Sequence, residues 1–515
     1  MSNWIDNAIA FLSPRAGAQR EAWRQSLEEM RSYDAGSRGR LYAGWGAVNQ
    51  SAEATNRFDR DTVRARARDL ERNSDLMTAT LSAYRRNVIG YGYVLQSKND
   101  NAKYNKDIEK LWNEWCKARN CDVTGAQSLN ELLRMAVDRK RVDGGILIHK
   151  CYTSHGVVPF QLQMIEVDEL DSMQLSPHSA GNHVVGGIEL NKQNRPVGYW
   201  IRQYDDYGMA TIDPVYLDAK DVIYYWEKKR PSQVREMSSM APTISRIRDA
   251  NEFMTAVSVK ERIQACLSVF IKKQYPTSGL GRTQGVQGPD GQITYDGKML
   301  TPGMIKEMNP GDEVQVINPT GQSADATSFT RMQQRLIAAG QGLSYEAVSR
   351  DVSDTNYSSC RFGSVEDDMT YQEEIEKIKA ILDEIYETFV ISAYLCGKVK
   401  FSKSFWDHKE EYFAHEWIKP PKRWVDPVKE SNANRNDLQT MAKSFKAMSA
   451  EQGHDWRQVI DDNAEVIRYA EEQGIDITPV LFGTSTTQQK EYDYETVPKE
   501  TDEGGDDDGS QEEGS

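Results

Sequence analysis

The sequence predicts an α+β protein in which one antiparallel β region lies between long helical segments. Short runs rich in Val, Ile, Tyr and Trp, separated by Gly, Pro, Asn and Asp, are concentrated in residues 145–226 and indicate strands. Two long helical segments follow at 243–273 and 360–396. Because the chain has 515 residues, about three domains are expected.

The residues before the β region predict helices. Apolar residues recur there at helical spacing. One helix is expected to begin at Ser128, because Glu131 follows three residues later, as in a capping box. Helices are therefore expected at 18–32, 59–88, 104–118 and 128–141.

The β region and the segments after it show different patterns. Pro242 fits the first turn of the helix at 243–273. Residues 276–325 are rich in Gly and Pro and predict a loop-rich module. In the helix at 360–396, apolar residues spaced by three and four form a narrow seam suited to packing along another helix. The expected strands are 146–148, 160–165, 187–190, 197–201, 222–226 and 314–317, and the other expected helices are 326–341, 430–448 and 455–473.

The charge is unevenly distributed along the chain. The formal net charge is −15. Residues 491–515 carry eleven acids and one Lys, so the remaining 490 residues carry only −5. A tail of this composition is expected to be disordered. The overall balance argues against a protein that coats nucleic acid electrostatically over its whole surface.

Motifs for membrane insertion, metal binding and catalysis are absent from the sequence. No run of 18 apolar residues is present, so no membrane span is expected. There is no phosphate loop, zinc-protease motif or nucleophile elbow. Two pairs of residues could bind a metal: Cys116 with Cys121, and His178 with His183. Ordinary packing is the better interpretation for the cysteines, and a solvated loop for the histidines. We therefore expect no catalytic residues, no metal and no cofactor.

An Arg-rich segment near the N-terminus has two interpretations. Arg60, Arg64 and Arg68 recur every four residues and should share one helix face. That face could contact phosphate or an acidic partner chain. Acids are interleaved with these arginines, so a solvated, locally paired face is the alternative.

Four strings of residues resemble those of a known family. They are Pro231–Ser238, Ile337–Glu346, Asp351–Arg361 and Trp424–Glu430, followed by Gly453, His454 and Asp455. In this order and spacing they resemble the portal proteins of tailed bacteriophages, in the lambda-like family, from about residue 20 to about residue 480. Two positions depart from the family pattern: Glu236 stands where Gly is usual, and Cys360 where a small residue is usual.

The resemblance implies a structural protein rather than an enzyme. Such proteins form a ring, typically a dodecamer, at one capsid vertex, through which double-stranded DNA is packaged and ejected. Implied partners are further copies of the chain, the terminase large subunit, the head–tail connector or adaptor, and the major capsid and scaffold proteins. The implied location is the virion, with the host cytoplasm during assembly. An enzymatic part of the packaging motor, a terminase ATPase or nuclease, is the alternative, which the missing motifs disfavour; an adaptor without a channel is a third.

The resemblance also implies a division of the chain into the parts of a portal fold. These are an N-terminal arm (1–39), a mixed α/β wing (40–240), a stem helix (243–273), a clip (274–325), a second stem helix (326–342), a tunnel loop (343–359), a long wing helix (360–396), a wing return (397–430), a helical crown (431–485) and a disordered acidic tail (486–515).

Three groups of candidate site residues follow from this division. Residues expected to face DNA in the tunnel loop are Ser344, Arg350, Ser353, Thr355, Asn356, Ser358 and Ser359. Candidate channel cations in the stem are Lys260, Arg262, Arg331 and Arg335, with surface salt bridging as the alternative for each. A subunit interface is hypothesised between Arg60, Arg64 and Arg68 on one side and Glu373 and Glu376 on the other.

Overall fold

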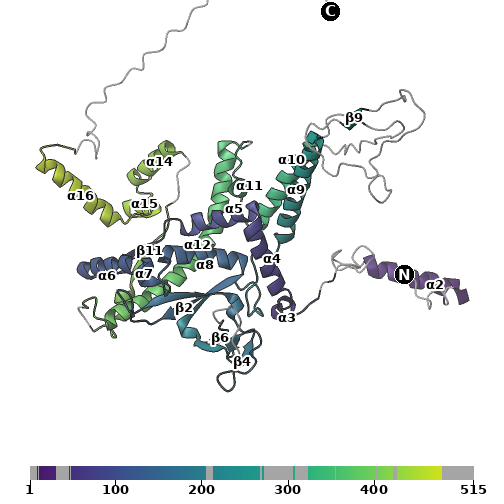
Figure 1. The fold of residues 1–515 in the computed structure, drawn as a ribbon, viewed down its shortest axis with the longest axis horizontal. Coiled ribbons are helices and arrows are strands. Elements are labelled where there is room, and N and C mark those ends of the chain that lie inside the picture. The colour runs from purple at the N-terminus through teal and green to yellow at the C-terminus, as the bar shows by residue number, and fades with distance from the viewer. Residues whose placement is uncertain are drawn as a thin grey trace, which may run out of the picture. The chain divides into compact units, whose positions relative to one another are not determined.

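The computed structural model describes residues 9, 11–29, 46, 48–204, 213–266, 270–271, 306–307, 323–353, 355–401, 404–421 and 426–477. The chain divides into two compact units, one of Met1–Tyr91 with Asn99–Ala414 and one of Gly92–Lys98 with His415–Ser515. The elements of both are labelled in Figure 1. The acidic tail, the expected strand at 314–317 and most of the expected clip lie outside the described residues.

Two antiparallel sheets form the β region of the first unit. In one, β2 is the central strand between β3 and β8; the other is a four-stranded meander, β4-β5-β6-β7. All five strands expected in this region are confirmed, whereas β4 and β7 were not predicted because their runs are short. The bounds are β2 (Gly145–Cys151), β3 (Gln161–Ile165), β4 (His183–Val185), β5 (Ile188–Leu190), β6 (Pro196–Ile201), β7 (Val215–Asp218) and β8 (Val222–Trp226).

One apolar cluster is shared by these two sheets. Each sheet contributes side chains that are almost fully buried, as expected for strands that cover a common core. Leu170, in the loop after β3, forms an isolated bridge with Ile201 of β6 and so links the sheets through the backbone. The cluster comprises Leu147, Ile165, Val167, Leu170, Ile188, Leu190, Tyr199, Ile201 and Val222.

The helix expected at 59–88 is divided into three segments. These are α4 (Arg60–Asn73), α5 (Asp75–Tyr84) and the π-helical turn η3 (Arg85–Ile89). Ser74 causes the break: its backbone is extended and its side chain accepts a hydrogen bond from the Met77 N–H at 3.4 Å, which caps a new helix. Ahead of them lie α2 (Pro14–Glu29) and α3 (Ala52–Asn56).

The longest helix, α12 (Tyr357–Leu395), carries the predicted apolar seam into the core of the first unit. The seam residues Ile375, Ile378, Leu382, Ile385 and Phe389 are each at most 3% exposed, which confirms that this face packs. Its aromatic partners come from α6 (Ala102–Trp115): the rings of Trp112 and Phe389 lie 5.1 Å apart. After the short helix α7 (Ala118–Cys121), the predicted capping box begins α8 (Leu129–Val142) and is confirmed.

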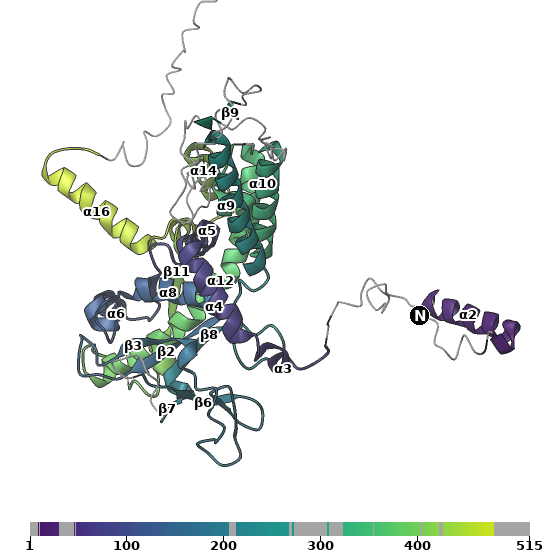
Figure 2. The ribbon, with the colours of Figure 1, turned by 45° about the vertical axis from the view of Figure 1, so that its right-hand side comes forward.

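Two helices lie side by side at the positions expected for the stem. They are α9 (Ile244–Cys266) and α10 (Ser323–Gly340), and both views in Figures 1 and 2 show them adjacent. The rings of Phe253 and Phe329 pack between them, 4.7 Å apart. Extension of the first helix to residue 273 was wrong, because β9 (Phe270–Ile271) pairs in parallel with β10 (Lys306–Glu307).

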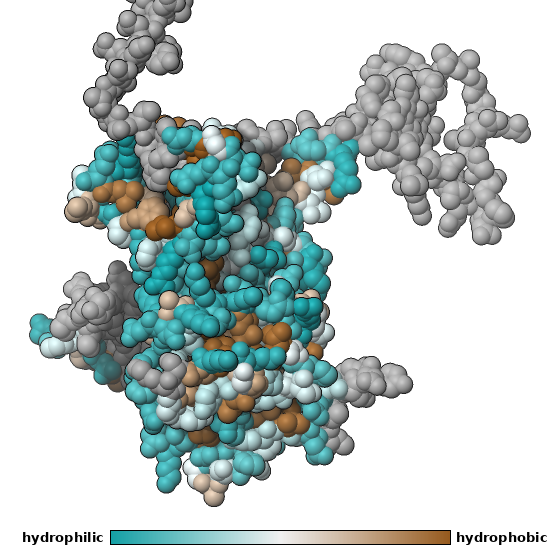
Figure 3. Space-filling model, turned by 90° about the vertical axis from the view of Figure 1, so that its left-hand side faces the viewer, coloured by the Kyte–Doolittle hydropathy of each residue, from teal (hydrophilic) through white to brown (hydrophobic). Residues whose placement is uncertain are grey.

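The second unit contains a two-stranded antiparallel sheet and small helices. β1 (Val94–Ser97) pairs with β11 (His415–Ile418) across more than 300 residues of chain. The helices are α14 (Pro427–Gln439), α15 (Phe445–Glu451) and α16 (Trp456–Glu472). Asp455 caps α16, as expected for a helix beginning there. Ile460, Val466 and Tyr469 of α16 are exposed. Figure 3 shows one face of the molecule, with brown apolar side chains among teal polar ones.

Candidate functional site

The expected tunnel loop contains a short helix, α11 (Tyr345–Ser349), fixed at its start by Ser344. The Ser344 Oγ accepts a hydrogen bond from the Ala347 N–H at 3.2 Å and donates to Asp367 of α12 at 2.7 Å. The Ser344 backbone N–H donates to the same carboxylate at 2.6 Å. The Ser344 side chain is therefore engaged within the chain and holds α11 against α12.

Polar contacts also hold the residues that follow α11. Arg350 has a left-handed backbone, with φ of 57°, and ends the helix. The Asp351 carboxylate accepts a hydrogen bond from the Tyr345 hydroxyl at 3.1 Å and lies 3.7 Å from the Arg331 guanidinium of α10. Nearby, the Thr355 hydroxyl donates to Glu346 at 3.1 Å. The segment thus closes on itself through polar side chains, while Leu343 and Val348 anchor it in the apolar core.

The expected DNA-facing residues therefore fall into two groups. Ser344, Thr355 and Asn356 use their side chains inside the chain, Asn356 by accepting a hydrogen bond from the Ser359 N–H at 2.8 Å to cap α12. The side chains of Arg350, Ser353, Ser358 and Ser359 are exposed, although Ser353 also donates to Asp351. Which of them faces DNA stays a prediction.

The four candidate stem cations are in different environments. Arg262 is exposed and donates to the Ser258 carbonyl of its own helix at 3.3 Å, and Lys260 is half-buried. Arg335 is exposed, with its guanidinium carbon 5.4 Å from the centre of the Tyr345 ring. Arg331 and Arg335 line a surface pocket of about 220 Å³ together with Tyr345, Asp351 and Asn356.

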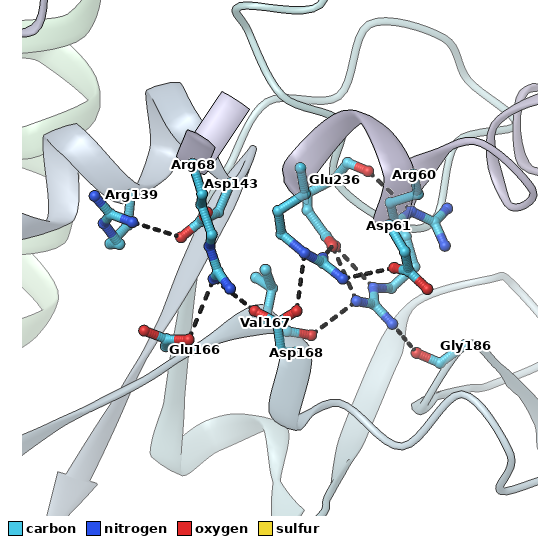
Figure 4. Close-up of polar contacts among 12 residues, drawn as sticks. Arg60, Asp61, Arg68, Arg139, Asp143, Glu166, Val167, Asp168, Gly186 and Glu236 are labelled. Atoms are coloured by element: carbon cyan, nitrogen blue, oxygen red, sulfur yellow. Dashed lines mark hydrogen bonds and ion pairs between the residues drawn. The ribbon is translucent and has the colours of Figure 1, made fainter. Parts of the chain in front are cut away.

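The Arg-rich face of α4 forms an intramolecular ionic network, shown in Figure 4. Arg64 contacts Asp61 at 2.5 Å, Asp168 at 2.9 Å and Glu236 at 3.2 Å. Arg68 contacts Asp143 at 2.6 Å and Asp168 at 2.5 Å. The network links α4 to the loops after α8 and β3 and to the segment that precedes α9.

The location of Arg60 and Arg64 corrects the expected subunit contact and the expected solvated face, whereas the expected local pairing is confirmed for Arg64 and Asp61. Arg60 and Arg64 are only 6% and 5% exposed, so they are neither a solvated face nor a surface available to another subunit. Their partners lie up to about 175 residues away in the sequence, which helical spacing alone does not reveal. By contrast, Glu373 and Glu376 on α12 are exposed.

Glu236 is the centre of the network and is fully buried. Its carboxylate accepts hydrogen bonds from Arg235 at 2.7 and 2.9 Å and from the Tyr224 hydroxyl, besides its contact with Arg64. Burial would raise the pKa of Glu236, but the Arg235 guanidinium outweighs burial and holds the pKa at about 2. The Glu at the position where the resembled family usually has Gly thus carries a permanent buried charge.

A second buried ion pair connects α12 with α8. The Lys140 ammonium lies 2.6 Å from one oxygen of the Glu374 carboxylate, and the Tyr225 hydroxyl donates to the same group. Burial lowers the pKa of Lys140 to about 8, against the opposite effect of Glu374. Burial would raise the pKa of Glu374, but Lys140 lowers it overall. Both groups are therefore charged at neutral pH.

The buried carboxyl of Asp138 on α8 is expected to make the stability of the fold depend on pH. Burial raises its pKa from 3.8 to about 7, although Arg85 lies 3.4 Å away and partly opposes the rise. A raised pKa means that the folded state holds the proton more tightly, so this carboxyl costs stability as pH rises from about 4 to 7. Asp138→Asn is expected to be more stable than the natural protein by up to about 4 kcal/mol at pH 8 and nearly equal to it below pH 4.

The measurement for Asp138→Asn is thermal unfolding of both proteins at pH steps from 4 to 8. Asn has the shape of the protonated acid, so the difference between the two proteins isolates the charge. A difference that stays constant with pH, or that favours the natural protein at pH 8, contradicts the raised pKa.

Within the described ranges, no group of three or more His, Cys, Asp or Glu side chains is placed to hold a metal ion. Among the same residues, no helix combines the length and apolar character needed to span a membrane.

Comparisons with known proteins identify relatives along most of the chain. The "probable portal protein" of Halomonas phage phiHAP-1 is 25% identical over 452 residues, covering 85% of this chain and 86% of the relative. The portal protein of Escherichia phage N15 is 19% identical, covering 85% of this chain and 90% of that protein. A solved structure titled "Neck of empty GTA particle computed with C6 symmetry" is 14% identical with a TM-score of 0.41, covering 81% of this chain and 98% of that one.

A family model matches a single continuous range of the chain. Its description is phage portal protein, lambda family, and it covers residues 38–374. The matched range includes both sheets, the two adjacent helices α9 and α10, α11 and the first half of α12. The fold is the expected α+β fold, and the chain belongs to the phage portal proteins of the lambda family.

Proposed function

We propose that this chain forms a ring, a dodecamer, at one vertex of a phage capsid, and that double-stranded DNA passes through the ring during packaging and ejection. The observation that carries the proposal is the match of the lambda-family portal model to residues 38–374. That family is structural rather than enzymatic, which agrees with the missing phosphate loop and metal motifs in the sequence. The proposed location is the virion, with assembly in the host cytoplasm.

The charge of the proposed DNA-facing segment suits a conduit. The expected tunnel loop, residues 343–359, contains one basic residue, Arg350, and three acidic residues, Glu346, Asp351 and Asp354. Each phosphate that a protein neutralises adds strongly to DNA affinity, so a basic lining would hold the duplex in place. Exposed hydroxyl groups such as Ser358 and Ser359 offer weaker contacts that exchange as DNA slides. Lys260 and Arg262 remain proposed stem cations.

The proposed partners follow from the family. The expected clip at 274–325 is the proposed docking end for the terminase large subunit and, after packaging, for the head–tail connector. Major capsid and scaffold proteins would contact the ring during assembly of the prohead. None of these contacts requires a cofactor.

Mass photometry of the purified protein tests the proposal. The expected result is a dominant species whose mass is a whole multiple of 58.5 kDa near twelvefold, with no ATP hydrolysis. A monomer that hydrolyses ATP would instead support a motor enzyme. A stable monomer without ATPase activity would indicate an adaptor without a channel.

A further inference from the structure

The first half of α12 exposes an apolar stripe that no described part of the chain covers. Phe362, Val365 and Met369 are 68%, 42% and 63% exposed. Their spacing of three and four residues places them on one side of the helix. Farther along α12 the seam that begins at Ile375 is buried. The second half of the helix therefore packs in the core, while the first half exposes apolar side chains to solvent.

Acidic side chains share this face of α12. Glu366 lies beside the stripe, and Glu373 and Glu376 continue the same side of the helix toward its centre. All three are exposed, and the ion pair of Glu376, with Lys379 at 3.0 Å, stays within the helix. The exposed face is thus apolar at its start and negatively charged beyond it.

A second exposed stripe lies on α10. Met332 and Leu336 are 50% and 43% exposed, and the exposed Ala339 continues their side of the helix. The exposed Arg335 lies on this side as well. The α10 stripe therefore combines apolar side chains with a positive charge, which complements the α12 face.

We propose that the α12 face of one subunit packs against the α10 stripe of the next copy of this chain. The inference rests on the proposed ring, because a ring joins two different patches of one surface. Contact of two α12 faces with each other would place acids against acids, and contact with DNA would place them against phosphates, so both are disfavoured. In this arrangement Arg335 binds the acidic face of a neighbouring subunit rather than DNA.

The test for the apolar contact is ring formation by the double variant Phe362→Glu/Met369→Glu, measured by mass photometry and negative-stain electron microscopy. Both sites are exposed in the subunit, so the fold should be kept, and circular dichroism checks this. The matched control is Leu395→Glu, at the other end of α12 with 69% exposure. The double variant is expected to lower the ring fraction about tenfold or more, while the control assembles normally.

A charge exchange identifies the partner surface. Arg335→Glu alone is expected to weaken assembly, and adding Glu366→Arg or Glu373→Arg in the same chain is expected to restore it. Two results would overturn the interface and leave the portal function standing. One is ring formation by Phe362→Glu/Met369→Glu at the yield of the natural protein. The other is failure of both charge exchanges to rescue Arg335→Glu. If the natural protein forms no ring, the proposed function itself fails, so the two failures are distinguishable.

Discussion

Glu236→Gln is expected to lower the free energy of unfolding by about 3–5 kcal/mol, because it removes one charge from a buried pair. Arg235, only 2% exposed, would keep its charge without a carboxylate partner, and Arg64 would lose one of its three contacts. Hydrogen exchange should show the loss first in α4 and in the segment before α9, since Glu236 joins them. The measurement is amide exchange combined with urea unfolding.

The matched control for Glu236→Gln is Glu252→Gln on α9. It makes the same chemical change in a pair with Arg248, also at 2.7 Å, whose side chains are 71% and 62% exposed. Exposed pairs contribute about 0–1 kcal/mol, so little change is expected. Equal effects of the two variants would contradict the assignment of Glu236 as the centre of the network.

The stabilising contribution of Glu236 depends on pH in a defined direction. The pKa of this carboxyl falls from 4.5 to about 2 on folding. A lowered pKa means that its contribution is complete above pH 4.5 and is lost as pH falls toward 2. Acid unfolding of the natural protein in this window should therefore be steeper than that of Glu236→Gln.

Lys140→Met is expected to cost a similar amount, about 3–5 kcal/mol, because it removes the cation 2.6 Å from the buried Glu374 carboxylate and leaves the more distant Arg141 guanidinium at 4.0 Å. The side chain of Glu374 is only 4% exposed. The loss should loosen the contact between α8 and α12. Urea unfolding followed by tryptophan fluorescence is a suitable measurement, because Trp112 packs against Phe389 of α12.

Two further variants separate charge from packing at Lys140. Lys140→Met/Glu374→Gln removes both charges and keeps an acceptor for the Tyr225 hydroxyl, so it should recover most of the stability. Lys379→Met makes the same change in a pair on the surface of α12, where Lys379 is half-buried and Glu376 exposed, and should cost less than about 1 kcal/mol. A double variant as unstable as Lys140→Met would show that volume, not charge, causes the loss.

Local patterns were sufficient to predict most regular elements. Short runs of β-forming residues bounded by turn residues identified five strands, and the seam from Ile375 to Phe389 identified the buried face of α12. The break at Ser74 was missed, because the apolar residues on both sides of this serine keep the spacing of one continuous helix. Only the capping hydrogen bond of Ser74, which the structure shows, marks the start of a new helix. The pairing of β1 with β11 was missed because short strands carry no signal for a partner so distant in the sequence.

The candidate site was predicted less completely, because its contacts also join residues that are far apart in the sequence. Helical spacing placed Arg60, Arg64 and Arg68 on one face but could not show that Glu236 and Asp168 fold against it. One signal was available: Glu236 stands where the resembled family usually has Gly, beside an arginine. Glu373 and Glu376 are exposed, as interface residues would be, while the subunit contact expected of them stays a prediction.

Cryo-electron microscopy of the purified natural protein tests the portal assignment most directly. We expect a closed ring with a central channel wide enough for duplex DNA, with α9, α10 and the segment around α11 nearest the axis. The α12 face should lie against α10 of the next subunit. A closed disc without a channel, isolated subunits, or a ring with the α11 segment on its outer rim would contradict it.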